Sequence, residues 1–414
     1  MRLSDQDQAM LAGQHGSGMQ LAMEMLVQVG EVQEAPDLID ITGAHIDSCL
    51  YHGQAGLDFA RALSETGAQV AVPTTLNVSS LDLLHPDLYR GSAETAAASK
   101  SLMDAYTDMG CQPTWTCAPY QLTERPGLGE QVAWGESNAI VFANSVLGAR
   151  TERYGDFLDI CCALTGRAPN VGLHTSAGRK ATVVVELDLP DGITENDALY
   201  PVLGSIIGEF AGTRVVAVVG LDDRAGEDEL KALGAAAATR GAVGMFHVVG
   251  VTPEADTLAM ATQGFDPEAS LIIDVNALNS ARAAFATGVG PLGAVSIGTP
   301  HFSIAEFREL ASLIDGEISA VPFYVSTGRD VLDRVSELGI VEKVEAFGAT
   351  IVTDTCTYIT PILEDVEGVV LTNSGKWAFY APGNLGVDVA FGSLRECVES
   401  ATAGALVTDG GWLG

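Results

Sequence analysis

The sequence predicts an α/β fold built from mostly parallel sheets. Short apolar runs rich in Val and Ile, such as "KATVVVELDLP" (180–190) and "TRVVAVVGL" (213–221), alternate with amphipathic stretches such as "IAEFRELASLIDG" (304–316). Glycines follow many of these stretches, as they do at helix C-termini. A regular succession of strand, loop, helix and strand is the pattern of parallel α/β layers.

The individual elements follow from the same patterns. Further helices are predicted over 56–67, 94–110, 281–288 and 329–339. Ser303 and Glu306 have the spacing of a capping box and should start the helix that follows "GTPHF". The other predicted strands lie within the runs 37–47, 67–78, 138–146, 244–252, 271–278, 293–303, 317–326, 348–359 and 368–377.

The 414 residues are enough for two or three domains with proper cores. A middle segment is rich in Ala and Gly and repeats its own strand–helix units. We therefore predict three α/β lobes, over residues 1–179, 180–290 and 291–414.

The composition limits the functional classes. The net charge of −33, from 54 acidic and 21 basic residues, argues against nucleic acid or an anionic membrane as a partner. No apolar run reaches transmembrane length, and Asp5 and Asp7 stand where the apolar part of a signal peptide would begin. We expect a cytoplasmic protein whose seven cysteines are reduced thiols or metal ligands.

Polar side chains gather where predicted strands end. Ligands of open α/β sheets bind beyond the carboxyl ends of the strands, so these residues form a candidate site. They are His45, Asp47, Cys49, Thr75, Asn77, Thr299, His301, Cys356 and Lys376. The loop of Cys117, in "TWTCAPY" between two prolines, precedes Glu136, Ser137 and Asn138 and can join them.

The cysteines divide into two groups. Cys161 and Cys162 in "FLDICCALTG" and Cys397 in "SLRECVESA" lie in helical stretches and are expected in the core. Three others, Cys49, Cys117 and Cys356, lie on polar loops, which favours a metal or iron–sulfur site. Since the chain has no C-x-x-C pair, distant segments must assemble any such cluster. Cys111 stays unassigned.

Two sets of charged residues, a basic cluster and a single glutamate, each allow two interpretations. His174, Arg179 and Lys180 precede a strand and are either a solvated turn or a cationic grip on a substrate carboxylate. Glu136 is either a surface carboxylate or an acid–base group. The glycine-rich "GQHGSGMQ" (13–20) lacks a preceding strand and is not expected to bind a dinucleotide.

Several of these motifs together resemble the large, catalytic part of the aconitase X family. They are "HIDSCLYHGQAGLDFA", "VPTTLNVSS", "TCAPY", "GESNAIVFANSVLGARTERYGD", "GTPHFS", "DTC" and "TNSGKWAFYAPG", and the resemblance runs essentially end to end. It implies an aconitase-like, multi-lobed α/β fold that lacks the small swivel domain. It also implies an iron-dependent hydro-lyase completed by a small swivel-domain subunit.

The resemblance further implies an iron–sulfur centre on cysteines from separate loops. Cys117 and Cys356 match the ligand motifs of the family, and Cys49 is the implied third ligand. Thr299 stands where the archaeal branch has a cysteine, so the chain resembles the hydroxyproline branch. We expect a 2Fe–2S centre, with mononuclear iron or 4Fe–4S as alternatives.

The expected reaction removes water from cis-3-hydroxy-L-proline and gives Δ1-pyrroline-2-carboxylate. Lys180 or Lys376 would hold the carboxylate, and Glu136 and His301 are candidates for acid–base work. Mevalonate 5-phosphate dehydration is the alternative reaction, for which Arg179 and Lys180 could grip the phosphate. A non-catalytic iron–sulfur scaffold or regulatory subunit is the alternative of another class.

Overall fold

The computed structural model describes residues 1–221, 225–364, 366–408 and 411–412. Two compact units share the chain. The first comprises Met1–Leu81 and Gly91–Lys180, and the second comprises Asp82–Arg90 and Ala181–Gly414. The predicted division into three lobes stays a prediction. No helix in the described ranges is long and apolar enough to cross a membrane.

The first unit contains two small sheets surrounded by helices. Its helices are α1 (Asp5–Leu11), α2 (Ser17–Val32), α3 (Gln54–Ser64), α4 (Ala93–Asp108), α5 (Ser137–Phe142) and α6 (Leu158–Thr165). Its strands are β1 (Leu38–Asp40), β2 (Ala44–Ile46), β3 (Thr74–Leu76), β4 (Ala133–Trp134) and β5 (Arg167–Pro169). Strands β3, β2 and β4 form a parallel sheet in that order, whereas β1 pairs with β5 antiparallel.

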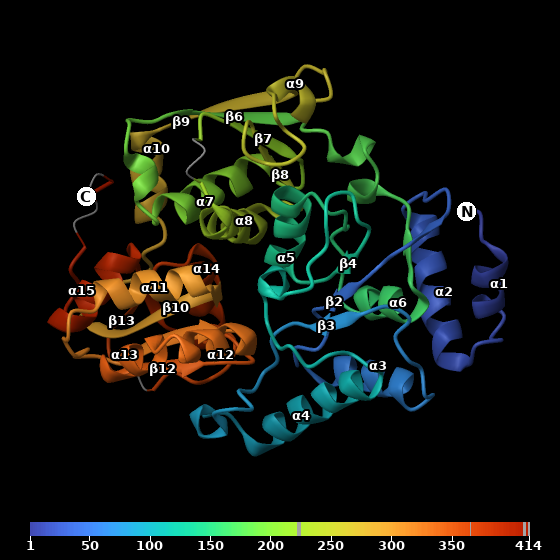
Figure 1. Cartoon of the computed structure of the whole chain (residues 1–414), viewed down its shortest axis with the longest axis horizontal. Helices are drawn as coiled ribbons and strands as arrows, with labels where there is room; N and C mark the ends of the chain where they lie inside the picture. Colours follow the sequence, from blue (N-terminus) through green and yellow to red (C-terminus); the bar gives the residue numbers. More distant parts are fainter. Residues whose placement is uncertain (222–224, 365, 409–410, 413–414) are drawn as a thin grey trace. The chain divides into compact units, whose positions relative to one another are not determined.

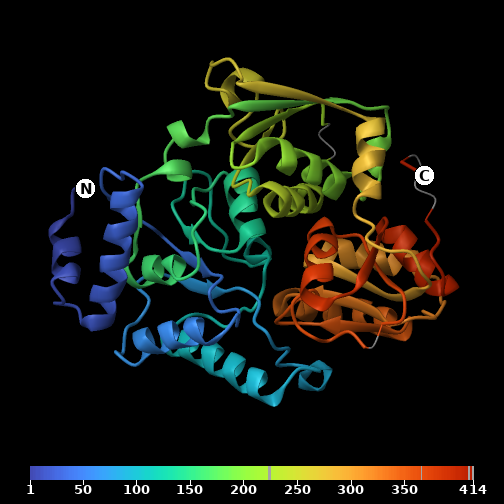
Figure 2. The same cartoon turned by 180° about the vertical axis from the view of Figure 1, so that it is seen from behind.

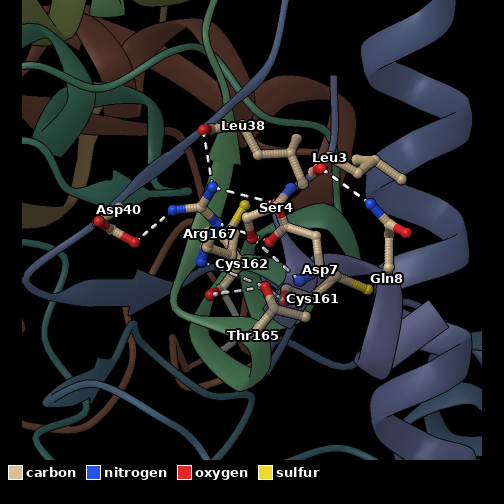
Figure 3. Close-up of polar contacts among 10 residues, drawn as sticks. All are labelled: Leu3, Ser4, Asp7, Gln8, Leu38, Asp40, Cys161, Cys162, Thr165 and Arg167. Carbon is tan, nitrogen blue, oxygen red and sulfur yellow. Dashed lines mark hydrogen bonds and ion pairs between the residues drawn. The ribbon is translucent and has the colours of Figure 1, made fainter. Parts of the chain in front are cut away.

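Helices α1 and α2 lie side by side in both views (Figures 1 and 2). An ion pair between Asp7 and Arg167 ties α1 to the β1–β5 pair, as Figure 3 shows. Arg167 donates from Nε to Asp7 Oδ1 (2.9 Å) and from its NH2 group to the Leu38 carbonyl (2.8 Å). Asp7 also completes the capping box of α1 with Ser4. One carboxylate thus both caps α1 and holds it against the sheet.

The second unit contains two larger parallel sheets. In chain order it begins with β6 (Val183–Asp188), α7 (Leu199–Ala211), β7 (Val216–Val219), α8 (Glu227–Gly241), β8 (Phe246–Val248), α9 (Leu258–Ala261), β9 (Ala269–Asp274) and α10 (Val275–Ala283). The four strands β6 to β9 form the first of the two sheets, in the order β8-β7-β6-β9. Helices α7 and α8 run along one face of that sheet and pack on each other (Figure 1).

The larger sheet has the order β12-β11-β10-β13-β14 and is parallel throughout. Its strands are β10 (Leu292–Phe302), β11 (Phe323–Thr327), β12 (Ala349–Val352), β13 (Val369–Thr372) and β14 (Asp388–Phe391). The helices are α11 (Ile304–Leu313), α12 (Arg329–Glu337), α13 (Ile340–Ala346), α14 (Gly375–Leu385) and α15 (Leu394–Ala403). Val295, Ile297, Phe307, Phe323 and Leu371 lie in its fully buried core.

The expected α/β class with mostly parallel sheets is confirmed, and so is the capping box of Ser303 and Glu306. The predicted strand over 138–146 is wrong, because α5 and a π turn (Ala143–Leu147) occupy it. Five of the six residues of α5 are buried, and an apolar run buried all round shows no period that separates helix from strand. The predicted strand over 67–78 shrinks to β3, so Thr75 lies within a strand.

Candidate functional site

In the first unit, the turn after β2 is held by a buried carboxylate. Asp159 Oδ2 accepts hydrogen bonds from the backbone N–H groups of Asp47 (2.7 Å) and Ser48 (3.2 Å), and its Oδ1 accepts from Ser48 Oγ (3.0 Å). Burial raises the pKa of Asp159 to about 6, and the hydrogen bonds from Ser48 and Asp47 oppose that rise. Asp159 therefore fixes the turn that carries Cys49.

Cys49 lies on this turn, as predicted, and is fully buried. Its Sγ lies 3.3 Å from the Ile46 carbonyl oxygen and 3.4 Å from that of Asn77. Burial raises the pKa of the Cys49 thiol well above its ordinary value, and the negative charge of Asp47 adds to the rise. In this arrangement Cys49 is a neutral thiol that donates to carbonyl oxygens.

Polar predicted residues meet at the β2–β3 edge. His45 Nδ1 lies 2.8 Å from Thr75 Oγ1, and the two residues are paired in register across the strands. Asn77 follows β3 and donates its side-chain amide to Asp47. Burial lowers the pKa of His45 to about 3, against the opposing effect of a hydrogen bond to the backbone of Thr116. His45 is accordingly a neutral imidazole.

Cys117 lies on a buried, non-helical loop, as its flanking prolines predict. Asn138 Nδ2 donates to the Cys117 carbonyl (2.9 Å), and Tyr120 Oη donates to Asn138 Oδ1 (2.6 Å). Glu136 caps α5 by accepting from the Ala139 N–H (2.8 Å), and Ser137 Oγ donates to its other oxygen (3.2 Å). The start of α5 thus brings Glu136 and Asn138 to the Cys117 loop.

The two basic residues at the end of the first unit, Arg179 and Lys180, have different surroundings. Arg179 is buried and donates to the side-chain oxygen of Asn144 (2.9 Å), to the Asn144 carbonyl (2.8 Å) and to the Leu173 carbonyl (3.2 Å). These bonds give Arg179 a structural role. Lys180, the next residue, is half-buried.

In the second unit, the loop of Cys356 follows β12 and is strongly constrained. Asp354 is fully buried, has a left-handed φ of 61°, and accepts two hydrogen bonds of 2.6 Å from Arg329. The Leu83 N–H donates to the same carboxylate (3.0 Å). One residue earlier, Thr353 donates its N–H to Asp82 (2.8 Å). The segment 82–90 therefore braces the chain just before Cys356.

His301 at the end of β10 faces the same loop. One of its ring nitrogens lies within 4.8 Å of Cys356 Sγ, and both side chains are buried. His301 Nε2 lies 3.2 Å from the Thr355 carbonyl oxygen. Burial lowers the pKa of His301 to about 4, so the ring is neutral, and a carbonyl partner places its hydrogen on Nε2.

A small pocket lies beside the start of α14. It is lined by Thr299, Ser374, Lys376, Lys231 and Glu306, among others. Thr299 Oγ1 is buried and has no hydrogen-bond partner among the described residues. Ser374 caps α14 by accepting from the Trp377 N–H (3.0 Å). A helix N-terminus, a lysine and an unpaired hydroxyl suit a carboxylate.

The pocket also contains a buried charge cluster. Lys231 forms ion pairs with Glu306 and with Asp228, the latter at 2.9 Å. Burial raises the pKa of Glu306 to about 7, against the opposing charge of Lys231. This cluster has no counterpart among the predicted site residues.

The donor chemistry fits iron. Cysteine sulfur and imidazole nitrogen are ligands that iron centres use, and the buried pair of Cys356 and His301 offers both at metal-binding separation. Sequence patterns did not reveal Asp159, Asp354 or Arg329, because their function depends on contacts between distant segments. Asp159 lies in an apolar helix, and that setting was the available signal.

Family models match almost the whole described chain in three consecutive segments. The aconitase X first domain matches residues 1–177, the second domain residues 181–283, and the third domain residues 292–403. The chain belongs to the aconitase X family.

Relatives in the aconitase X family refine this result. The chain is 44% identical to a cis-3-hydroxy-L-proline dehydratase of Hypocrea jecorina, over 99% of this chain and 70% of that protein. It is equally identical to the Pseudomonas aeruginosa enzyme of that name, over 97% and 70%. Identity to the phosphomevalonate dehydratase large subunit of Methanosarcina mazei is 35%, over 98% of both chains.

A solved aconitase X structure has the same fold. The chain superposes on the holo-form of Thermococcus kodakaraensis aconitase X with a TM-score of 0.88 at 33% identity, over 97% of this chain and 100% of that one. The expected aconitase-like fold is confirmed. The expected assignment as a hydro-lyase is confirmed by the dehydratase relatives.

Proposed function

We propose that this aconitase X chain dehydrates cis-3-hydroxy-L-proline to Δ1-pyrroline-2-carboxylate. The observation that carries the proposal is the 44% identity to two dehydratases of that substrate, against 35% to the phosphomevalonate enzyme. The reaction breaks the C2–H and C3–O bonds, releases water, and leaves an enamine that tautomerises to the cyclic imine.

We propose that Cys117 and Cys356 hold a 2Fe–2S centre, with Cys49 as the third ligand implied by the family resemblance. Such a centre would supply Lewis acidity, which would make the 3-hydroxyl a better leaving group. The protein's own task at Cys356 is to keep its loop in a fixed conformation, and the bracing of Asp354 by Arg329 is suited to that task.

The substrate carboxylate is proposed to bind at the pocket of α14. Lys376 supplies positive charge, Thr299 Oγ1 supplies an unused hydroxyl, and the start of α14 supplies its dipole. Lys180 is the second cationic candidate. Charge that develops on the carboxylate as the C2 proton leaves would be stabilised by the same groups.

Proton transfer at C2 requires a neutral or anionic base. Glu136 and His301 are the proposed candidates, since Glu136 is a buried carboxylate and His301 a neutral imidazole. The remaining proposed contacts are hydrogen bonds to the substrate from residues near the first unit's β2–β3 edge and the start of α5. They are His45, Asp47, Thr75, Asn77, Ser137 and Asn138.

We propose that a small swivel-domain subunit of the same family completes the site. The archaeal relatives bear the name of large subunits, and the chain covers 98% of the Methanosarcina mazei one. The substrate of the completed enzyme is proposed to be a small hydroxy acid.

The alternative substrate, mevalonate 5-phosphate, has weaker support. Its phosphate was expected at Arg179 and Lys180, but the Arg179 guanidinium is already bonded to Asn144 and Leu173. A scaffold role is disfavoured by buried polar groups such as His45 in β2 and His301 near the end of β10, because a scaffold does not require them.

A substrate panel tests the proposal. The iron-loaded chain, assayed with the small subunit, is offered cis-3-hydroxy-L-proline, its trans isomer and mevalonate 5-phosphate. We expect o-aminobenzaldehyde to trap the imine only from the cis substrate. If only mevalonate 5-phosphate were turned over, the proposed substrate would be wrong. An iron-loaded complex that turns over none of the three compounds would favour the non-catalytic scaffold role.

A further inference from the structure

The charge cluster of Lys231, Glu306 and Asp228 carries a further inference, which rests on the proposed function of the pocket beside α14. Lys231 and Glu306 line that pocket together with Thr299 and Lys376. Thr299 is only 6% exposed, and its Oγ1 has no hydrogen-bond partner among the described residues. A buried hydroxyl without a partner indicates that the pocket holds a polar ligand.

Lys231 has no hydrogen left for such a ligand. Its Nζ donates to Asp228 Oδ1 (2.9 Å), to Glu306 Oε2 and to the His301 carbonyl oxygen (3.5 Å). An ammonium group has three hydrogens, so these three acceptors use them all. Burial alone would lower the pKa of Lys231, but the charges of Glu306 and Asp228 raise it above its ordinary value. Lys231 is thus a fixed cation that holds Glu306 in place.

Glu306 keeps one carboxylate oxygen for a ligand. Both hydrogen bonds that described residues donate to Glu306, from Lys231 Nζ and from the Ser303 N–H (2.8 Å), go to Oε2. The side chain is 20% exposed, and it lines the pocket. Oε1 is therefore the oxygen with unused lone pairs, and it can accept a hydrogen bond from a donor in the pocket.

The cluster makes part of the pocket negative. Two carboxylates, Asp228 and Glu306, face the single positive charge of Lys231. Burial raises the pKa of Glu306 to about 7, and a bound cation would favour its anionic form. Lys376 and the start of α14 give the pocket positive charge as well. A small pocket that has groups of both signs fits a zwitterion.

We infer that Glu306 binds the protonated ring nitrogen of the substrate and that Lys231 positions Glu306 for this contact. In cis-3-hydroxy-L-proline the nitrogen and the carboxylate carbon are both bonded to C2, so one pocket can recognise both groups. The ammonium donates a charge-assisted hydrogen bond to Glu306, while the carboxylate binds at Lys376 and Thr299 as proposed above. The Glu306 carboxylate also repels a phosphate, so it selects against mevalonate 5-phosphate.

Calorimetric binding of two acids to the full chain with its small subunit tests the inference. L-proline has the ring ammonium, whereas (S)-tetrahydrofuran-2-carboxylate has an ether oxygen in its place. Neither acid has the 3-hydroxyl that dehydration removes. The variants are Glu306→Gln, which keeps the capping box of α11, and Lys376→Met. Asp228→Asn is the matched control, since it removes a charge from the same cluster at a residue outside the pocket lining.

The wild type should bind L-proline at least about tenfold more tightly than the oxygen analogue, the factor expected for one charge-assisted hydrogen bond. Glu306→Gln should lose most of this preference, and Asp228→Asn should keep it. Lys376→Met should weaken the binding of both acids by similar factors. Equal binding of the two acids by the wild type, or an unchanged preference in Glu306→Gln, would overturn the inference.

The same measurements separate this inference from the proposed function. Turnover of cis-3-hydroxy-L-proline by a wild type that shows no preference would overturn the contact to Glu306 alone. Unchanged affinities in Lys376→Met would instead refute the proposed carboxylate position, and a wild type that binds neither acid would overturn both. Circular dichroism checks folding. If Glu306→Gln does not fold, Glu306→Asp, which draws the carboxylate back by one methylene, should lower the preference in its place.

Discussion

The second unit should be sensitive to loss of the buried carboxylate of Asp354. We predict that Asp354→Ala lowers the free energy of unfolding of this unit by about 3 kcal/mol. The carboxylate is fully buried, and it accepts two hydrogen bonds from Arg329 and one from the Leu83 N–H. Removal of one partner of a buried ion pair costs roughly 3–5 kcal/mol.

The expected value lies at the lower end of that range for a structural reason. The Arg329 side chain is 30% exposed, so its guanidinium can turn toward water once the carboxylate is gone. The partly buried Leu83 N–H also loses its partner, which raises the cost. The left-handed φ of 61° adds to the cost, because Ala disfavours this conformation more than Asp does.

The assay is denaturant unfolding combined with hydrogen exchange of peptides that cover 349–361. Asp333→Ala is the matched control, since Asp333 is an exposed carboxylate on the same helix as Arg329 and should change stability by less than about 0.5 kcal/mol. Exchange in the 349–361 peptides should accelerate only in Asp354→Ala. Unchanged stability and protection in Asp354→Ala would refute the bracing role.

Three further predictions concern other buried groups. Asp7→Asn should cost about 2 kcal/mol, because the largely buried Arg167 loses its charge-assisted hydrogen bonds to Asp7 but keeps Asp40 and the Leu38 carbonyl as partners, and unchanged denaturant unfolding of the first unit would contradict this. Folding raises the pKa of Asp159 from 3.8 to about 6. Between these two pH values the folded state therefore holds a proton on Asp159 that the unfolded state has lost. The stability that Asp159 contributes should thus fall by about 2–3 kcal/mol as pH rises from about 4 to about 6. Unfolding at several pH values should show this slope in the wild type but not in Asp159→Asn, and identical slopes would contradict it. Finally, Cys→Ser at Cys161, Cys162 or Cys397 should cost about 1–3 kcal/mol without changing iron content, and iron loss in Cys162→Ser would show that a ligand had been misassigned.

The sequence was informative about the fold where local patterns dominate. The Val-rich runs at 183–188 and 216–219 and the capping box of Ser303 are read from neighbouring residues alone, and the structure confirms them. The segment 138–146 was mispredicted because burial on all sides removes periodicity. Strand β14 was missed, since the run at 388–391 is short and begins with an exposed Asp.

The candidate site shows the same limit. The loop positions of Cys49, Cys117 and Cys356 follow from flanking prolines and polar turns, and the structure has all three on loops. The neighbours of those loops come from distant segments. Asp82 reaches the chain before Cys356 across 271 positions, and Asp159 reaches Ser48 across 111. Neighbouring residues do not predict such contacts, because the contacts form only when distant segments pack together.

The most direct test of the central claim is the dependence of dehydration on bound iron. Turnover of cis-3-hydroxy-L-proline is measured by imine trapping on samples of the chain and its small subunit loaded with graded amounts of iron, and on Cys356→Ser treated in the same way. We predict that turnover rises in proportion to iron bound per chain and is absent from Cys356→Ser. Full turnover by the iron-free protein or by Cys356→Ser would contradict the proposed function.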